Sequence, residues 1–167
     1  MEPWQRLDGL GEAEARATLT SCCGSSRWVD RMLTRRPFSS QASLLAAARD
    51  EWFGLGEADW REAFAHHPRI GDRASLQTRF PETRDLSLRE QRGVDSAGAD
   101  VLTALEKGNR RYEATFGHIF IICATGKTAA EMLDRLKARL GNDAATEIRV
   151  AAAEQAEITA LRLNGLA

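Results

Sequence analysis

The sequence predicts an all-α, single-domain helical bundle over residues 1–167, with a long functional loop at about 66–96. Three observations predict this class. Apolar residues recur at helical spacing along most of the chain. The segment 66–96 loses that spacing, and we interpret it as functional because helical segments flank it on both sides. Finally, 167 residues, 43% hydrophobic and 28% charged, match one globular domain with a buried core.

Two short helices are predicted near the N-terminus. Glu12 to Leu19 predicts the first, which ends before Gly24. Trp28 and Met32 lie one helical turn apart and mark the second. Arg36-Pro37 closes this second helix, because proline disfavours helical backbone at the residue before it.

A third and a fourth helix are predicted between Ser39 and Ala65. Ser39 or Ser40 caps the third helix, and Gly54 and Gly56 break it. Its apolar residues follow the i, i+4, i+8 rule and are Leu44, Leu45, Ala48, Trp52 and Phe53. The fourth helix is predicted over Glu57–Ala65, where two aromatic residues lie one turn apart.

Beyond the predicted loop, apolar residues again trace a regular helix. They are Val101, Leu105, Gly108, Tyr112 and Phe116. Gly117 is placed to end this helix. The apolar run 118–124 is too short to classify by its period, and a strand there has no clear partner strand. We interpret it as a buried connector or a helix turn.

The last two helices carry local start and stop signals. The pattern Thr128-Ala129-Ala130-Glu131 is a capping box that opens a helix through Leu140, and Gly141 stops it. Asn142 or Asp143 caps the final helix, which extends to about Leu163. No internal repeat or domain linker interrupts this order.

Composition excludes several classes of function. The net charge is −1 and the sequence pI is about 6.3, so neither nucleic acid nor an anionic membrane is an expected partner. No apolar run reaches membrane length and no leader pattern opens the chain. Three cysteines (Cys22, Cys23 and Cys123) make no disulfide framework. A cytoplasmic location is therefore expected.

The tetrad His66-His67-Pro68-Arg69 is the strongest candidate for chemistry. Imidazole titrates nearest neutral pH and is the usual proton carrier in catalysis. Pro68 places His67 in extended backbone at a helix exit, where the negative end of the helix dipole would favour a cationic ring. The alternative is a polar loop that happens to contain histidines, and these residues alone do not decide between the two.

A second candidate is Ser87-Leu88-Arg89-Glu90-Gln91. The structural interpretation is a capping box, with Ser87 at the N-cap and Glu90 three residues on. The functional interpretation places Glu90 beside His67, where a carboxylate would orient the imidazole and raise its pKa. Gln91 offers both a donor and an acceptor to an amide-like ligand. Both interpretations remain open.

Arg162 is predicted on the apolar stripe of the last helix, with Ile148, Ala151, Gln155 and Ile158. Arginine is seldom buried without a partner. Either its stem covers apolar surface while the guanidinium reaches water, or the guanidinium points into a polar pocket.

Other motifs are weak. Gly126-Lys127-Thr128 matches the end of a phosphate loop, but position 121, where that motif starts with glycine, is Ile121. Adjacent histidines point in different directions and no His-Glu-x-x-His spacing exists, so no metal is expected. Cys123 lies in an apolar run, where a thiol is usually an inert core residue.

Four blocks of residues occur along the chain in the same order as in one enzyme family. They are His67-Pro68-Arg69-Ile70-Gly71-Asp72; Ser87-x-x-Glu90-Gln91; Phe116-Gly117-His118-Ile119-Phe120-Ile121-Ile122-Cys123-Ala124-Thr125-Gly126; and Glu154-Gln155-x-x-Ile158-Thr159-x-Leu161-Arg162-Leu163. The chain resembles the OHCU decarboxylases of ureide metabolism, which act on 2-oxo-4-hydroxy-4-carboxy-5-ureidoimidazoline (OHCU). Each block alone is weak, and the joint match is specific. His66, where many relatives have alanine, is a minor difference.

The resemblance implies an all-helical carboxy-lyase, usually a homodimer, that converts OHCU to (S)-allantoin in urate catabolism without cofactor or metal. It implies catalytic roles for His67, the general acid/base, and Glu90. It also implies a small-molecule substrate bound by Pro68, Ser87, Gln91 and Arg162, and by backbone groups of Ile119, Phe120 and Ile121. Two rival classes remain open. One is a non-enzymatic helical interaction module, and the other is a hydrolase that uses Cys123 with a histidine.

Overall fold

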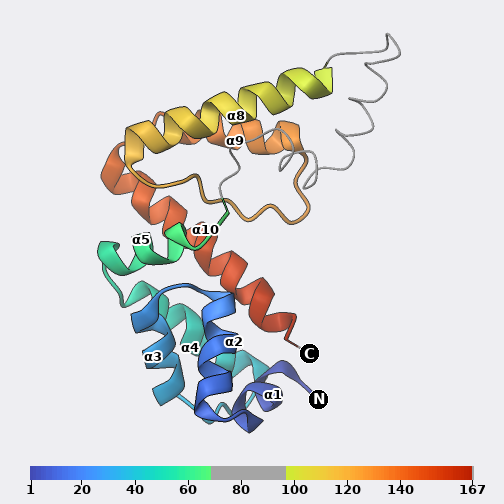
Figure 1. The fold of residues 1–167 in the computed structure, drawn as a ribbon, viewed down its shortest axis with the longest axis vertical. Helices are drawn as coiled ribbons and strands as arrows, with labels where there is room; N and C mark the ends of the chain where they lie inside the picture. The colour runs from blue at the N-terminus through green and yellow to red at the C-terminus, as the bar shows by residue number, and fades with distance from the viewer. Residues whose placement is uncertain (69–96, 167) are drawn as a thin grey trace. The chain divides into compact units, whose positions relative to one another are not determined.

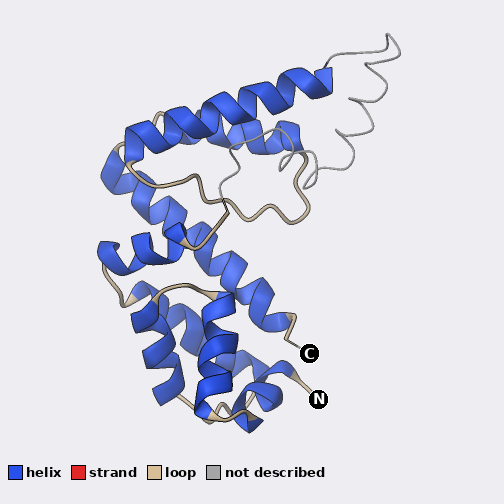
Figure 2. Cartoon of the chain, in the orientation of Figure 1, coloured by secondary structure: helices blue, strands red, loops and turns tan. Residues whose placement is uncertain are grey.

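The computed structural model describes residues 1–68 and 97–166. All regular secondary structure in these two ranges is helical (Figure 2), so the all-α prediction is confirmed. Contacts between residues divide the chain into two compact units, Met1–His67 with Ile148–Ala167, and Pro68–Glu147. The single domain over 1–167 stays a prediction. The predicted loop at 66–96 lies outside the described residues from position 69 onward.

The first unit contains five N-terminal helices (Figure 1). They are α1 (Pro3–Gly9), α2 (Glu12–Cys22), α3 (Ser26–Thr34), α4 (Gln41–Phe53) and α5 (Glu57–Ala65). The four predicted helices are confirmed, and Ser40 caps α4 by accepting a hydrogen bond from the Ser43 backbone at 3.0 Å. Helix α1 was not predicted. It is seven residues long, and a capping box between Glu2 and Gln5 supports it rather than an apolar stripe.

Two buried tryptophan side chains form hydrogen bonds between helices of the first unit. Trp28 and Trp52 are almost fully buried, and each indole N–H needs an acceptor there. Trp28 Nε1 donates to the Ala48 carbonyl at 3.0 Å, and Trp52 Nε1 donates to the Ala152 carbonyl at 2.8 Å. The second bond joins α4 to the last helix, α10 (Ala144–Asn164), whose residues from Ile148 onward belong to this unit.

The helices described in the second unit are α8 (Ala97–Phe116), α9 (Ala129–Arg139) and the first four residues of α10. Helices α8 and α9 lie side by side (Figure 1), and Gly108 permits their close approach. A Cβ atom at that position would lie 2.4 Å from Leu136 Cδ2. Gly117 ends α8 with a φ of 76°, a conformation that glycine adopts without strain.

The segment 117–128 contains neither helix nor strand, so of the two interpretations of the run 118–124, a connector or a helix turn, the structure shows the connector. Its apolar side chains complete the core of the second unit. The buried members of that core are Leu102, Leu105, Tyr112, Phe116, Phe120, Ile122, Ala129, Met132, Leu133 and Leu136. The predicted caps that follow are also present, because Thr128 accepts from the Glu131 backbone and Asp143 from the Thr146 backbone.

A buried polar group, here called the Glu147 cluster, lies beside this core and comprises Glu147, Arg139, Tyr112 and Asn142. The Glu147 carboxylate accepts from the Tyr112 hydroxyl at 2.5 Å, from Arg139 Nε at 2.8 Å and from Asn142 Nδ2 at 2.9 Å. Arg139 Nη1 donates to the Ile121 carbonyl at 2.7 Å. The cluster therefore ties α8, the connector, α9 and the start of α10 together.

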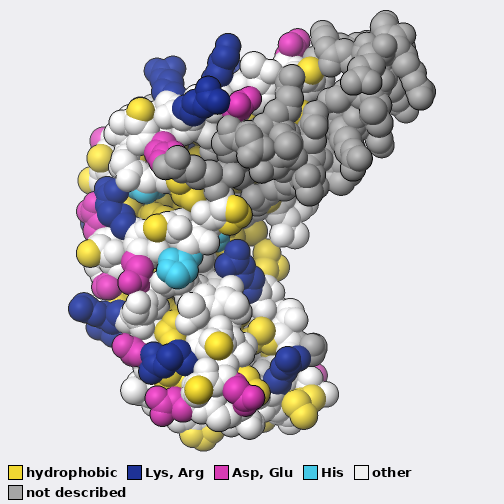
Figure 3. Space-filling view, viewed as in Figure 1, with side chains coloured by type: hydrophobic (Ala, Val, Ile, Leu, Met, Phe, Trp, Pro, Cys, Tyr) yellow, Lys and Arg dark blue, Asp and Glu magenta, His cyan; other side chains and the backbone are white. Residues whose placement is uncertain are grey.

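Charged side chains of both signs share the face seen in Figure 3, in agreement with the mixed charge of the sequence. Among the described residues, no helix combines the length and the apolar character that crossing a membrane requires.

The three cysteines are buried, and no disulfide joins them. Burial raises the pKa of the Cys23 thiol from 9.0 to about 11. Below pH 9 both the folded and the unfolded states hold this proton. Between about pH 9 and 11 the unfolded state loses the proton while the folded state keeps it. We therefore expect the free energy of unfolding to fall as the pH rises through this window, by up to about 3 kcal/mol from this group.

Urea unfolding at about pH 8, 9.5 and 11 measures this slope. Cys23→Ala is the matched comparison, because Cys22 and Tyr112, whose pKa values burial also raises, remain in both proteins. Equal slopes in the two proteins would contradict the assignment to Cys23.

Candidate active site

His67 lies at the end of α5, as its position before Pro68 predicted. His66 is the C-cap of the helix, and the His67 backbone N–H donates to the Phe64 carbonyl at 3.1 Å. The segment between α2 and α3 packs directly against this exit. A Cβ atom at Gly24 would lie 2.3 Å from Cγ of His66, so only glycine allows the approach. The two histidines are therefore held at a fixed place on the first unit.

The His67 ring is hydrogen-bonded to the last helix. Its Nε2 atom lies 2.5 Å from Oε1 of Gln155. Gln155 Nε2 in turn donates to Thr159 Oγ1 at 3.1 Å, and Thr159 Oγ1 lies 3.5 Å from the Cys22 carbonyl at the end of α2. The Gln155 side chain is 0% exposed and that of Thr159 is buried as well. A continuous polar chain thus runs from the candidate proton carrier to a backbone carbonyl.

One face of α10 presents these groups. Gln155, Thr159 and Arg162 follow the i, i+4, i+7 spacing that places side chains on the same side of a helix. We call these three residues the polar ladder of α10. Its members face two ends of the first unit's helices, with Gln155 at the exit of α5 and the other two at the C-terminal turn of α2.

The placement of Arg162 corrects the helical-wheel prediction. The buried stripe of α10 in the first unit is Ile148, Ala151, Ala152, Gln155, Thr159 and Leu163, while Arg162 is exposed beside it. Its Nη1 atom donates to the Ser21 and Cys22 carbonyls, both at 3.3 Å. These carbonyls end α2 and lack partners within that helix, so the cation satisfies them and opposes the negative end of the helix dipole.

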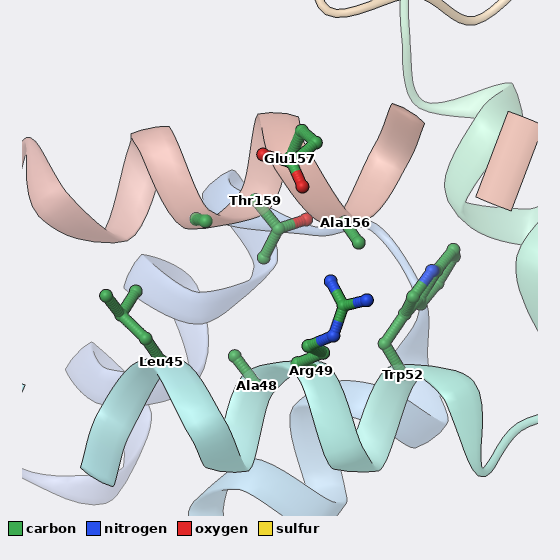
Figure 4. A pocket seen from close by; sticks show the side chains of 8 residues that line it. Leu45, Ala48, Arg49, Trp52, Ala156, Glu157 and Thr159 are labelled. Carbon is green, nitrogen blue, oxygen red and sulfur yellow. The ribbon is translucent and has the colours of Figure 1, made fainter. Parts of the chain in front are cut away.

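Near the polar ladder, a pocket of about 140 Å³ lies between α4 and α10 (Figure 4). Arg49 and Glu157 are its charged residues, and the other lining residues are Leu45, Ala48, Trp52, Ala156, Thr159 and Ala160. None of the predicted site residues lines it. Groups of three or more His, Cys, Asp or Glu side chains able to hold a metal ion do not occur within residues 1–68 and 97–166.

The family model for OHCU decarboxylase matches residues 8–164 of the chain. The chain belongs to the OHCU decarboxylase family. The resemblance seen in the sequence motifs is therefore confirmed. Both the α5 exit with His67 and the polar ladder of α10 lie inside the matched residues.

Individual proteins of known name are also similar to this chain in sequence. The chain is 41% identical to the uric acid degradation bifunctional protein TTL of Arabidopsis thaliana, over 87% of this chain and 45% of that protein. It is 29% identical to the 2-oxo-4-hydroxy-4-carboxy-5-ureidoimidazoline decarboxylase of Amia calva, over 78% of this chain and 74% of that protein. The chain spans less than half the length of the bifunctional relatives that it matches.

A solved structure of OHCU decarboxylase in the presence of (S)-allantoin is also similar. The TM-score is 0.70 at 40% sequence identity, and the match covers 88% of this chain and 94% of that one. This likeness extends the family assignment from the sequence to the arrangement of the helices.

The second unit holds the other predicted OHCU decarboxylase site residues that are described. Phe120 and Ile121 are buried in its core, and Ile119 is partly buried. The Ile119 carbonyl lies 2.9 Å from Nδ1 of His118, and that of Ile121 accepts from Arg139. The carbonyls of Ile119 and Ile121, two of the three residues whose backbone groups are predicted to contact substrate, therefore already have protein partners. Pro68 is described and exposed.

Ser87, Glu90 and Gln91 lie outside the described residues. Their roles stay predictions. Gln155 was not predicted as the partner of His67, although its spacing placed it on the apolar stripe of the last helix. A polar amide on such a stripe is the signal that would have identified it, because a buried amide needs partners.

Proposed function

We propose that this chain is a carboxy-lyase that decarboxylates OHCU to (S)-allantoin. The observation that carries the proposal is the family match over residues 8–164, together with the 40% identity to an OHCU decarboxylase of known structure. The position of His67 at a constrained helix exit supports it further, because a proton carrier must be held in place to act on one atom of a substrate.

The structure of OHCU allows decarboxylation without a cofactor. The carboxylate of OHCU is attached to a hydroxylated ring carbon that neighbours a C=N bond. When CO2 leaves, the electron pair of the broken C–C bond moves into this C=N system and gives an enol-like intermediate. The imine nitrogen and the neighbouring ring carbon each take a proton, and the hydroxyl group loses its proton to become the ring carbonyl, which gives allantoin. The substrate supplies the electron sink, so we propose a reaction without cofactor or metal. The protein positions the ring, moves protons and stabilises charge.

Each site residue receives one role in this proposal. His67 is the general acid/base, and Glu90 orients it. Ser87 and Gln91 hold ureido and ring amide groups, while Pro68 and backbone groups of 119–121 contact the ring. Arg162 faces a carbonyl or a developing oxyanion rather than the departing carboxylate, since pairing with that carboxylate would stabilise the ground state. A homodimer in the cytoplasm is part of the same proposal.

The direct test supplies the purified protein with freshly generated OHCU, made by urate oxidation and ring-opening hydrolysis, and follows its decay. We expect the product to be (S)-allantoin. Spontaneous decarboxylation gives a planar intermediate that water protonates from either face, whereas one fixed acid protonates one face. Enantioselectivity needs only about 2–3 kcal/mol between the two proton-transfer barriers.

Circular dichroism of the fresh product measures this outcome before racemisation. Unaccelerated decay would overturn the proposed function. An accelerated decay with racemic product would keep the decarboxylase activity and remove His67 as a positioned proton donor.

Arg162→Lys separates the two roles available to Arg162. Lysine keeps the positive charge at the end of α2 but loses the planar guanidinium fork. We expect a sharp fall in kcat, roughly tenfold or more, with thermal stability close to that of the wild type. Thermal unfolding and steady-state kinetics measure the pair. An Arg162→Lys enzyme with full activity would show that Arg162 serves only the Ser21 and Cys22 carbonyls.

A further inference from the structure

We propose that Gly24 is a positioning residue, which sets where the exit of α5 places the backbone of His67. The proposal rests on the proposed function for the part that His67 plays in catalysis. The placement itself follows from contacts between α5 and the segment 24–27, and it can be measured without substrate.

One side of α5 is held against segment 24–27, which leads from α2 into α3. Glu62 and His66 lie one helical turn apart, and both contact this segment. The Glu62 carboxylate accepts from the Ser26 backbone N–H at 2.5 Å and from the Ser26 hydroxyl at 3.0 Å. It thereby satisfies an N–H at the start of α3, where the helix dipole favours a negative charge. His66, one turn further on, packs directly on Gly24.

The requirement for glycine at position 24 comes from this close approach and not from the backbone conformation. Positive φ values among the described glycines occur at Gly117 and Gly126, so Gly24 has a backbone that other residues adopt. A Cβ atom at position 24 would lie 2.3 Å from Cγ and 2.6 Å from Cβ of His66. Ordinary contact begins at 3.4 Å, so one side of the contact would have to move by about 1 Å.

Rotation of the His66 side chain cannot relieve the clash. Rotation about χ1 moves Cγ but leaves Cβ, which is fixed to the backbone, at 2.6 Å. The Gly24 side is constrained, because its neighbours Cys23 and Ser25 are almost fully buried and Ser25 caps α3. Ala65 and His66 are exposed. The displacement therefore falls on the backbone at the exit of α5.

A displaced exit would carry His67 with it. His67 directly follows the residue that would clash, and its backbone N–H donates to the Phe64 carbonyl in the same last turn at 3.1 Å. Contacts of the His67 ring, with Gln155 and in the proposed function with Glu90, act on an imidazole whose attachment point the exit has set. A misplacement of about 1 Å can cost on the order of 10² in rate, so the contact at Gly24 is large enough to affect catalysis.

Substitutions at position 66 test this contact by removing its two parts in turn. His66→Ala deletes the ring but keeps Cβ, and His66→Gly deletes both. With His66 in place, we expect Gly24→Ala to lower kcat roughly tenfold to a hundredfold and to change KM by about threefold or less. The same substitution should lower kcat less in the His66→Ala background, and by about twofold or less in the His66→Gly background.

The matched control is Gly9→Ala, because nothing lies within 4 Å of the Cβ atom added there. Its kcat should stay close to that of the wild type. Circular dichroism and thermal unfolding establish that each variant is folded. If Gly24→Ala does not fold with His66 in place, the comparison of the His66→Ala and His66→Gly backgrounds gives the same test.

Nitrogen NMR of protein labelled at histidine measures the placement of His67 without substrate. His67→Asn identifies the His67 ring signals by removing them. We expect Gly24→Ala to shift these signals when His66 is in place, because the ring then meets its partners in an altered geometry. In the His66→Gly background, Gly24→Ala should leave the His67 signals unchanged.

Three results would overturn the proposal. They are a Gly24→Ala protein with native kcat, an equal fall in kcat in all the backgrounds, and a fall in kcat with unchanged His67 signals, which would place the loss elsewhere. If the His67 signals respond as expected but the wild-type protein does not accelerate the decay of OHCU, the placement of His67 is right and the proposed function is wrong.

Discussion

Replacing His67 with asparagine is expected to lower kcat by a factor on the order of 10² to 10⁴, the usual contribution of a positioned general acid/base. Asparagine has no group that titrates near neutral pH, so it cannot exchange a proton with the substrate. Its amide can still donate a hydrogen bond toward Gln155. We therefore expect the free energy of unfolding to change by roughly 1 kcal/mol or less.

Steady-state kinetics and thermal unfolding of the purified variant measure both quantities. His66→Ala is the matched control, because it removes the adjacent imidazole, which packs on Gly24. Its effect on kcat should be much milder. Near-native turnover in His67→Asn would show that another group carries the proton.

Replacing Arg139 with methionine is expected to lower the free energy of unfolding by about 3–5 kcal/mol. The reason is the carboxylate of Glu147, which is 0% exposed and would be left buried without a cation. Methionine keeps the apolar stem over the Phe120 ring, where the Arg139 guanidinium now lies 4.5 Å from the ring centroid. Such a loss is a large share of the stability of a typical domain.

Urea unfolding measures the effect, and a double variant separates its causes. Arg139→Met combined with Glu147→Gln removes the uncompensated charge and should recover part of the loss. Arg110→Met removes an exposed ion pair with Glu106 and should cost about 1 kcal/mol or less. Equal losses in Arg139→Met and Arg110→Met would contradict the role of the Glu147 cluster.

The helices were predictable wherever their signals are local. Ser40, Thr128 and Asp143 each cap a helix by bonding to a backbone N–H three residues on, so a short stretch of sequence contains the whole signal. Helix α1 was missed because seven residues hold too few apolar positions to show a period. The apolar run 118–124 was too short to classify by its period and had no clear partner strand, so the sequence left a connector or a helix turn, and the structure shows a connector.

The site was predictable only in part. His67 was predicted as a site residue from its residue type and from the adjacent Pro68, and its role in catalysis stays a prediction. Its partner Gln155 is 88 positions away, and no local pattern links the two. Arg162 stays a predicted site residue, and a helical wheel assigns a residue to a face without showing that two carbonyls of α2 lie within reach. The Glu147 cluster was missed for the same reason, because it joins four separate segments.

The division of the chain into units sets an order for folding during synthesis. Residues 68–147 are contiguous, so the ribosome releases everything the second unit contains before the first unit is complete. The first unit needs residues from Ile148 onward, although its five N-terminal helices are made earliest. Until α10 emerges, the Trp52 indole, the His67 ring and the final carbonyls of α2 lack the partners that α10 supplies. His67, the candidate proton carrier, is thus translated early but gains its contact with Gln155 last, and a nascent chain cannot complete this candidate site before its final helix docks.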